Sequence, residues 1–270
     1  MLLAARAPRG LRAALLSPRS RDRWIAAAAQ EHEDEAARLA DEITVGQGFV
    51  VLENAFAFDT INAARNLVIQ RLQEGVDTDE DSNEEESALI YHLLDHHPLF
   101  STFTEQKVLT KVLSQVLGTD FVLSSFAAHC LFPGFPGQPV HLDYPYDLFE
   151  HGMTEIEFEQ ALVTKQIIDE DSAVPSYLNV QILIMLDHFT TENGATGLIP
   201  GSQHPLRDPA PYELSAVQQV VANAGSVLVH TGRLHHAAMP SSPSAHPRMA
   251  LLLQYVPAGV RPLEPGARGH

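Results

Sequence analysis

The sequence predicts a mainly β domain with flanking helices, whose core is a double-stranded β-helix, or jelly roll. Two observations support this fold class. The first half of the chain carries long stretches with helical periodicity. The second half contains short runs of branched and aromatic residues separated by Pro, Gly, Asn and Ser. A jelly roll is the economical way to close many short strands beneath a layer of helices. The runs lie at 121–132, 178–186, 226–230 and 249–256.

The first elements are expected to be a helix and a strand. Residues 25–43 are rich in Ala and Glu, which are good helix formers. Residues 49–52 form an apolar β-branched run, which is typical of a strand. The chain therefore passes from an N-terminal helix into the sheet.

Two amphipathic helices should follow. Asp59 is a candidate N-cap for the first, and Gly75 suits its left-handed C-terminal position. Thr104 is a candidate N-cap for the second, which should end at Gly118. Each helix presents one apolar stripe, so both should cover the sheet. The stripes consist of Ile61, Ala64, Leu67, Val68 and Leu72, and of Val108, Leu109, Val112, Leu113, Val116 and Leu117.

An acidic segment, EGVDTDEDSNEEE at 74–86, lies between these helices. It has almost no apolar side chains, so it cannot bury enough surface to offset the entropy of ordering. We expect a mobile loop. A calcium site is the alternative, but the ligand spacing of a hand-like calcium loop is missing.

Length and composition predict one folded domain at 25–262, followed by a C-terminal tail at 263–270. The chain has 270 residues, of which 45% are hydrophobic, enough for one sizeable core. No apolar run reaches the roughly 18 residues of a membrane span. The formal charge of −17 disfavours nucleic acid and membrane surfaces as partners. Oligomeric state leaves no signature in the sequence.

Residues 1–24 form a basic segment with a different composition. Six arginines lie here among Leu and Ala, and Asp22 is the only acid. The segment is either disordered or a targeting peptide, because mitochondrial presequences share this composition. The chain is therefore expected to be cytoplasmic, or mitochondrial if residues 1–23 act as a presequence. The single Cys130 excludes an internal disulfide and fits a buried small hydrophobe.

The most informative motif is His141-Leu142-Asp143. On a strand, His141 and Asp143 would project from the same face. A facial non-haem iron(II) site needs two histidines and one carboxylate, with positions left open for other ligands. His235 and His236 are the candidates for the second histidine.

Several segments together resemble the phytanoyl-CoA dioxygenase family. The family pattern joins a Gln-x-x-His-x-Asp segment, an Asn-Gly…Ile-Pro-Gly-Ser segment, and a late His followed by Arg. The resemblance covers about 48–256, nearly the whole folded body, although Gln203, Ser241 and Ser242 depart from the usual pattern. The chain supplies, in order, Gln138, His141 and Asp143, then ENGATGLIPGSQ at 192–203, then His236 and Arg248.

The resemblance implies an Fe(II)- and 2-oxoglutarate-dependent dioxygenase with a jelly-roll, cupin-like core. Iron would be held by His141, Asp143 and His236, with His235 as the rival for the last position. Arg248 would bind the far carboxylate of 2-oxoglutarate, because its planar fork matches a carboxylate. The reaction would use O2 to oxidise a small organic substrate, most simply by hydroxylation, and release succinate and CO2. Desaturation and cyclisation remain alternatives, whereas halogenation is disfavoured because Asp143 supplies a carboxylate.

Four further residues are candidates because they lie close in sequence to the site strands. His129 and Gln181 are expected to contact the cosubstrate, and Gln138 and Tyr144 the substrate. Two rival functions stay open. A cupin-like metalloenzyme that does not use 2-oxoglutarate would have no need of Arg248, and a non-catalytic jelly-roll binding module would tolerate loss of Asp143.

Overall fold

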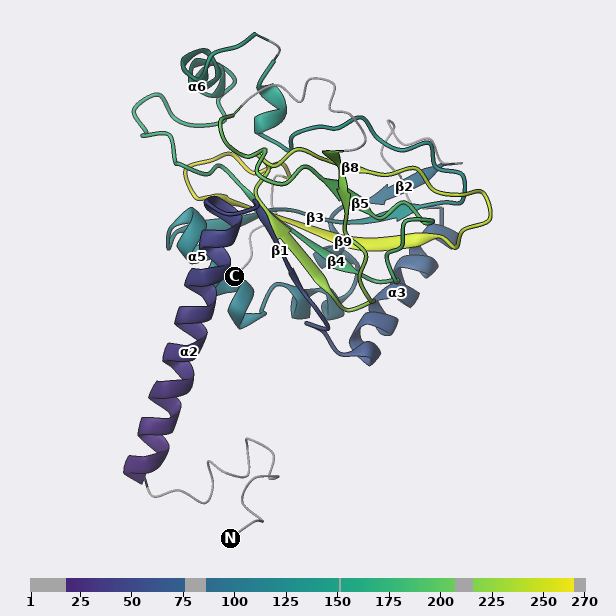
Figure 1. Ribbon diagram of the computed structural model, residues 1–270, viewed down its shortest axis with the longest axis horizontal. Coiled ribbons are helices and arrows are strands. Elements are labelled where there is room, and N and C mark those ends of the chain that lie inside the picture. The colour runs from purple at the N-terminus through teal and green to yellow at the C-terminus, as the bar shows by residue number, and fades with distance from the viewer. Residues whose placement is uncertain (1–17, 76–85, 151, 207–215, 265–270) are drawn as a thin grey trace.

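Two antiparallel sheets form the centre of the molecule (Figure 1). The computed structural model describes residues 18–75, 86–150, 152–206 and 216–264, with side chains from residue 30. The large sheet has the order β1-β7-β4-β9-β3-β2 and the small sheet the order β6-β5-β8. The large sheet contains β1 (Phe49–Leu52), β2 (Ser87–Ile90), β3 (Phe121–Leu131), β4 (Val180–Met185), β7 (Val227–His230) and β9 (Arg248–Pro257). The small sheet contains β5 (Thr196–Leu198), β6 (Gln218–Gln219) and β8 (His236–Ala238).

Helices cover one face of the large sheet, as predicted (Figure 1). Helices α2, α3 and α5 supply buried residues to the same apolar cluster as strands β3, β4, β7 and β9. The helical elements are α2 (Pro18–Thr44), α3 (Phe58–Gln73), α4 (Leu93–His96), α5 (Lys107–Leu117), α6 (Glu155–Thr164), and the 3₁₀ helices η1 (Pro98–Phe103) and η2 (Tyr146–Leu148).

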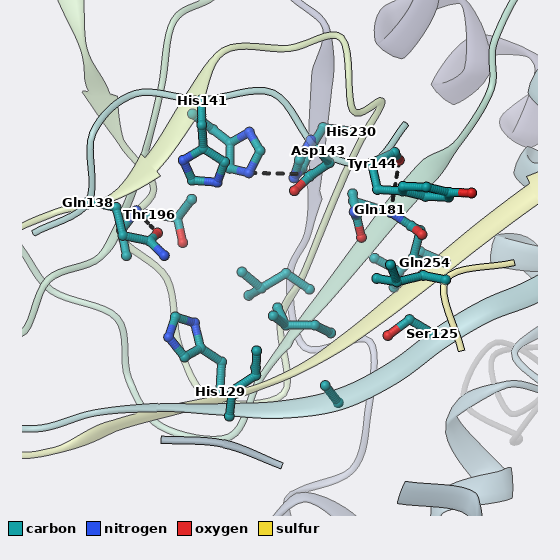
Figure 2. Close-up of a pocket in the computed structure, with 18 of the residues that line it drawn as sticks. Ser125, His129, Gln138, His141, Asp143, Tyr144, Gln181, Thr196, His230 and Gln254 are labelled. Carbon is teal, nitrogen blue, oxygen red and sulfur yellow. Dashed lines mark hydrogen bonds and ion pairs between the residues drawn. The ribbon is translucent and has the colours of Figure 1, made fainter. Parts of the chain in front are cut away.

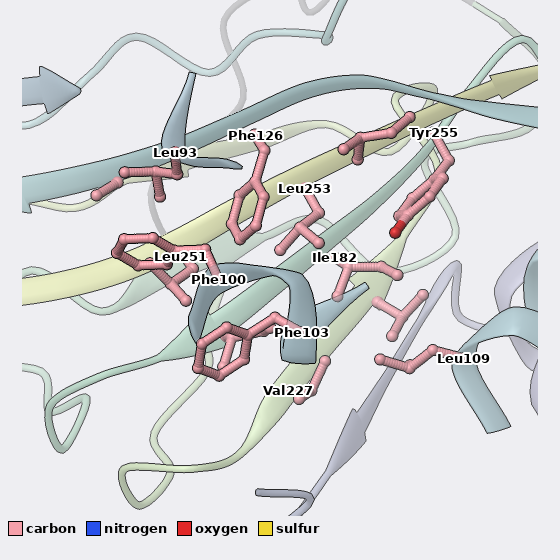
Figure 3. Packing of buried hydrophobic residues seen from close by; sticks show 14 of the residues in the cluster. Leu93, Phe100, Phe103, Leu109, Phe126, Ile182, Val227, Leu251, Leu253 and Tyr255 are labelled. Carbon is pink, nitrogen blue, oxygen red and sulfur yellow. The ribbon is translucent and has the colours of Figure 1, made fainter. Parts of the chain in front are cut away.

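The long pair β3–β9 divides the interior into two sides. The pairing runs from Phe121 opposite Pro257 to Leu131 opposite Arg248, with one irregularity after Leu123. Because side chains alternate along a strand, Leu251 and Leu253 pack beneath the helices (Figure 3). Their neighbours on β9 face a cavity on the opposite side. The same strand therefore builds both the core and the site.

The helical side of the sheet is a dense apolar core (Figure 3). Phe100 on η1 is fully buried, and its ring meets that of Phe126 edge-on at 6.0 Å between centroids. The ring of Phe103 packs against that of Phe56 in a tilted arrangement, with 5.0 Å between the centroids. Fully burying each such side chain stabilises the fold by roughly 1.5–3 kcal/mol. This packing gives the sheet a rigid base for the residues on its other face.

The structure confirms the predicted strands β1, β3, β4, β7 and β9, but it corrects both predicted helix caps. Helix α3 has Ala57 as its N-cap, and Asp59 lies in the first turn, where its charge favours the helix dipole. Helix α5 is capped by Gln106, whose side chain accepts a hydrogen bond from the Leu109 amide at 2.8 Å. Thr104 instead ends η1 and donates to the Ser101 carbonyl. The predicted positive φ of Gly75 is confirmed at 66°.

Helix α2 begins at Pro18, before the expected start at residue 25. Proline is tolerated at a helix start because its fixed φ fits the first turn and its missing N–H would have no partner there. The end of the basic segment is therefore helical, while residues 1–17 lie outside the described part. The acidic loop also lies largely outside it, at 76–85. None of the described helices is long and apolar enough to cross a membrane.

Several elements were not predicted. Helix α6 has a complete capping box between Thr154 and Glu157, a signal that is present in the sequence. Strand β2 is a short edge strand, and each strand of the small sheet has only two or three residues. Such strands are too short to show a period of two. Glu264, which lies two residues past the expected domain boundary at 262, is also buried.

Candidate active site

A cavity of about 250 Å³ lies on the side of the large sheet that faces away from the helices (Figure 2). Asp143 and Arg248 are the only Asp, Glu, Lys or Arg side chains among its described lining residues. The lining residues are Leu89, Tyr91, Ser125, Ala127, His129, Gln138, His141, Asp143, Tyr144, Gln181, Ile182, Leu183, Thr196, His230, His236, Ala238, Arg248, Leu252, Gln254 and Leu263.

The structure brings His141, Asp143 and His236 together at this cavity. One potential ligand atom from each lies within 4.8 Å of the other two. The Nε2 atom of His236 is 3.4 Å from Oδ2 of Asp143, and the two imidazole ring centroids are 4.4 Å apart. Two imidazoles and one carboxylate at this spacing can bind one divalent metal ion.

The segment that carries His141 and Asp143 is not the regular strand that we expected. Only His141 forms a β-bridge, with His236. Its amide donates to the His236 carbonyl at 2.9 Å and its carbonyl accepts from the His236 amide at 3.2 Å. The Asp143 amide donates to the Gly232 carbonyl at 3.1 Å, and Leu142 is buried in an apolar cluster. Backbone hydrogen bonds to β8 and to the segment before it thus place both side chains at the cavity.

The hydrogen bonds of the two histidines leave the same ring atom of each available. Nδ1 of His141 lies 2.9 Å from the Pro139 carbonyl, and Nδ1 of His236 lies 2.9 Å from the Leu234 carbonyl. A carbonyl only accepts, so Nδ1 must carry the hydrogen. Nε2 is then the atom of each ring that a metal would bind, and in His236 this atom already lies beside the Asp143 carboxylate.

The electrostatics of the three residues are coupled. Burial would raise the pKa of Asp143, but the nearby His236 and the other histidines hold it well below its usual range. Burial lowers the pKa of His236, yet Asp143 more than offsets this and raises it above the ordinary value. The pKa of His141 is lowered, first by burial and then by His236. The carboxylate is therefore ionised and ready to bind a cation.

His235 does not face this cavity. It is fully buried, its amide donates to the Ser202 hydroxyl at 2.9 Å, and its carbonyl accepts from the Ile199 amide at 3.0 Å. Of the two neighbouring histidines, only His236 lies beside Asp143. The pairing of β8 with β5 holds the backbone of His236 in an extended conformation. Because adjacent side chains of an extended chain point to opposite faces, His235 points away when His236 faces Asp143.

Arg248 is a buried cation, and Asp187, an acid whose charge acts on it, is already engaged by other groups. It opens β9, is 2% exposed, and its guanidinium carbon lies 4.2 Å from the ring centroid of Phe189. Asp187 is bonded to Arg65 Nε at 2.6 Å and to the Met249 amide at 2.9 Å. Within the described chain, no carboxylate forms an ion pair with Arg248, and its Nε has no hydrogen-bond partner. Burial lowers the pKa of Arg248 to about 9.

An unpaired buried guanidinium is costly unless a partner arrives. The cost therefore points to an anionic ligand at this end of the cavity. Because the guanidinium is a planar fork of N–H donors, a carboxylate can bind to it through two parallel hydrogen bonds.

The cavity has two ends along the strands. Arg248 and Gln254 are six residues apart on β9, roughly 20 Å at the usual rise per residue. His129 lies near the Arg248 end, since it pairs with Ala250. Ser125 and Gln181 both pair with Gln254. Figure 2 shows this separation, with His129 at one end and Ser125 and Gln254 at the other.

Gln138 and Tyr144 both line the cavity but lie at different ends (Figure 2). Gln138 lies beside Thr196 on the side of His129, and its side-chain oxygen accepts from the Ala238 amide at 3.0 Å. Tyr144 lies at the Gln254 end, and its hydroxyl donates to the Arg261 carbonyl at 2.7 Å. Gln138 was predicted to contact the substrate but lies on the side of His129, whereas Gln181 was predicted to contact the cosubstrate but lies at the Gln254 end. The roles of these residues remain predictions.

His230 is a lining residue that sequence reasoning missed. It ends β7, and its ring centroid lies 4.7 Å from that of His236. Burial, followed by His236, lowers its pKa to about 4, so it is neutral at pH 7. A histidine that closes an apolar strand was the available signal. Thr196 gave no signal, because it lies on a three-residue strand.

The chain is similar in sequence or structure to several known proteins. A family model described as phytanoyl-CoA dioxygenase (PhyH) matches residues 45–250. SnoN, a non-haem α-ketoglutarate-dependent epimerase from nogalamycin biosynthesis, has a TM-score of 0.62 at 15% identity, covering 88% of this chain and 90% of SnoN. HygX from Streptomyces hygroscopicus, solved with nickel and 2-oxoglutarate, has a TM-score of 0.57 at 14% identity, covering 80% and 85%. A nickel complex of the non-haem monooxygenase ThoJ has a TM-score of 0.57 at 17% identity, covering 87% and 84%.

The structural likeness confirms the jelly-roll fold, and the sequence match extends over most of the described domain. Both agree with the three side chains at the cavity that could hold a metal ion. The chain therefore belongs to the phytanoyl-CoA dioxygenase (PhyH) family of Fe(II)- and 2-oxoglutarate-dependent oxygenases.

Proposed function

We propose that this protein hydroxylates a small organic substrate, with Fe(II) held by His141, Asp143 and His236 and with 2-oxoglutarate anchored at Arg248. The observation that carries the proposal is the presence, in one cavity, of a facial donor set and a buried, unpaired guanidinium. A metalloenzyme without an acidic cosubstrate would leave Arg248 uncompensated. A non-catalytic module would need neither feature.

The donor set fits Fe(II). Two imidazole nitrogens and one carboxylate on one side of a metal leave open positions for a chelating cosubstrate and for dioxygen. With these bound, the site supplies oxidising chemistry that converts 2-oxoglutarate to succinate and CO2. The carbonyls of Pro139 and Leu234 orient the two rings through Nδ1, and such partners tune metal affinity.

The chain's own residues divide the cavity between two ligands. Arg248 would take the far carboxylate of 2-oxoglutarate, and the neutral side chains of His129, Gln138 and Thr196 lie on its side of the cavity (Figure 2). The pKa of His129 is lowered to about 3, first by burial and then by Arg248, so it adds no charge there. Ser125, Tyr144, Gln181 and Gln254 line the opposite end. This end would receive the substrate, and its lining favours an uncharged molecule with hydroxyl or amide groups.

The test is to follow both halves of the reaction in one assay. Purified protein with Fe(II), 2-oxoglutarate and isotopically labelled dioxygen would be incubated with a library of small neutral compounds. We expect succinate release that rises with the true substrate, and a product that gains one labelled oxygen atom. Succinate release coupled to a product without new oxygen would contradict hydroxylation. It would favour a reaction that adds no oxygen to the product, such as the epimerisation for which SnoN is named. No succinate release would contradict the oxygenase itself.

A further inference from the structure

The segment 261–264 contributes one wall of the cavity through Leu263. Leu263 lines it, although this residue lies far along the chain from the metal-binding side chains. The Leu263 amide donates to the Ser124 hydroxyl at 2.8 Å. Two residues earlier, the Tyr144 hydroxyl donates to the Arg261 carbonyl at 2.7 Å. The wall lies at the end that Ser125 and Tyr144 line, which is the end away from Arg248.

Glu264 anchors this wall through a buried carboxylate. Its residue is 5% exposed. One carboxylate oxygen accepts from the Ser125 hydroxyl and from the Phe126 amide, the latter at 3.0 Å. The other lies 2.9 Å from Nδ1 of His92 and 3.3 Å from the His92 amide. The Glu264 amide also donates to the Ser124 carbonyl at 2.8 Å.

The buried carboxylate of Glu264 depends on its hydrogen-bond donors. A buried carboxylate without donors would be strongly unfavourable, so these contacts must be kept together. His92 adopts a left-handed backbone with φ of 57°, which non-glycine residues rarely take, and it presents both donors to Glu264 in this conformation. The anchor thus specifies one position for the segment.

Core packing does not explain where Leu263 lies. The residue is 45% exposed, one of the few large apolar residues in the described chain with so much exposure. Burial of the Leu263 side chain therefore contributes only part of the free energy that a fully buried leucine would give. The hydrogen bonds of Ser124 and Glu264 on either side of its peptide unit hold it at the cavity instead.

We propose that Leu263 is a specificity-determining residue of the substrate end of the cavity, and that Glu264 is the positioning residue that holds it there. The proposal rests on the function proposed above, because it takes the end away from Arg248 as the substrate end. The side chain at 263 limits the length of the molecule that fits between this wall and the metal. Its size should change which substrates bind without changing how 2-oxoglutarate binds.

The anchor is tested first by amide hydrogen exchange on the full chain. Glu264→Gln keeps the size of the side chain but removes the charge that four donors share. We expect the amides of Phe126 and Leu263 to exchange about tenfold faster or more in this variant, with the β4 amides unchanged. Glu105→Gln, an exposed acid elsewhere, is the matched control. Unchanged exchange at both amides would overturn the positioning role of Glu264.

Specificity is tested by binding, so that it does not depend on turnover. The wild type, Leu263→Ala and Leu263→Trp would be loaded with Ni(II) and 2-oxoglutarate and titrated calorimetrically with neutral alcohols and amides of graded length. We expect longer compounds to bind to the Ala variant and only shorter ones to the Trp variant, with the 2-oxoglutarate Kd within about twofold of wild type. The same set of bound compounds in all three proteins would overturn the proposal. Size-graded binding without succinate release in the Fe(II) form would instead retain this inference and contradict the proposed reaction.

Discussion

His141 and His236 exchange two backbone hydrogen bonds, so the strand that carries one imidazole holds the other in place. Asp143 reaches the same point because its amide is bonded to Gly232, at the start of the turn that leads into β8. Backbone hydrogen bonds therefore bring the three candidate ligands together. The geometry should be present before any metal binds.

Two adjacent histidines give the sharpest test of the ligand set. We expect His236→Ala to lower Fe(II) affinity by more than about 100-fold, beyond the usual effect of losing a residue that only orients a ligand through a hydrogen bond. His235→Ala should retain stoichiometric metal, because His235 faces away from Asp143. Bound iron would be measured on protein whose folding is verified by circular dichroism. Equal loss of metal in the two folded variants would contradict the assignment.

Arg248 should act on the cosubstrate and not on the metal. Removing a charge-assisted pair costs roughly 1.5–3 kcal/mol, so we expect Arg248→Ala to raise the 2-oxoglutarate Kd by about 10- to 100-fold. Arg248→Lys should recover only part of this, since an ammonium cannot form the bidentate pair. Calorimetric titration on the Ni(II)-loaded protein measures it, with the exposed Arg38→Ala as control. A 2-oxoglutarate Kd unaffected by both substitutions would exclude a direct contact.

The neutral His129 should make the fold sensitive to acid. Its folded pKa of about 3 lies below the ordinary value of 6.5, chiefly because of burial. Below pH 6.5 the unfolded chain therefore binds a proton that the folded protein does not, and the free energy of unfolding falls as the pH drops toward about 3.

We expect His129→Asn to reduce the slope of the unfolding free energy with pH by up to about 1.4 kcal/mol per pH unit, which corresponds to one proton. The exposed His246→Asn should leave it unchanged. Denaturant unfolding of the metal-free protein between pH 4 and pH 7 measures the slope. A slope identical in wild type and His129→Asn would show that His129 titrates normally in the folded state.

Cys130 should be inert in the folded protein. Its side chain is fully buried, and burial raises the pKa of the thiol to about 12, so almost no thiolate exists at pH 8. We expect iodoacetamide to label it only after unfolding in guanidinium. Mass spectrometry of the intact chain reads the result, and rapid labelling of the native protein would place the thiol nearer to solvent.

The sequence predicted the parts of the fold that have strong periodic signals. Strands β3 and β9 are long, branched and bounded by turn residues, and their alternation follows from local chemistry. The small sheet could not be predicted, because its strands are stabilised by pairing with segments distant in sequence. The helix caps at 57 and 106 were missed because side chains such as Gln106 cap helices less often than Thr or Asp.

The residues that meet at the candidate site were predictable from the sequence, but the shape of the cavity was not. The resemblance to the family identified His141, Asp143, His236 and Arg248, and the structure places all four at one cavity. The division of the cavity into two ends depends on strand register, which a single sequence does not reveal. For the same reason, the anchored wall at Leu263 lay inside a segment that composition alone predicted to be a tail.

The central claim is that one cavity binds both iron and 2-oxoglutarate through these residues. The most direct measurement is the visible spectrum of the metal-free protein reconstituted with Fe(II) under nitrogen, before and after adding 2-oxoglutarate. We expect a weak charge-transfer band in the wild type, lost in Asp143→Ala and weakened in Arg248→Ala, and unchanged in the exposed control Asp120→Ala. Iron bound with no band in the wild type would contradict the claim, as would a band of full strength in the Asp143 and Arg248 variants.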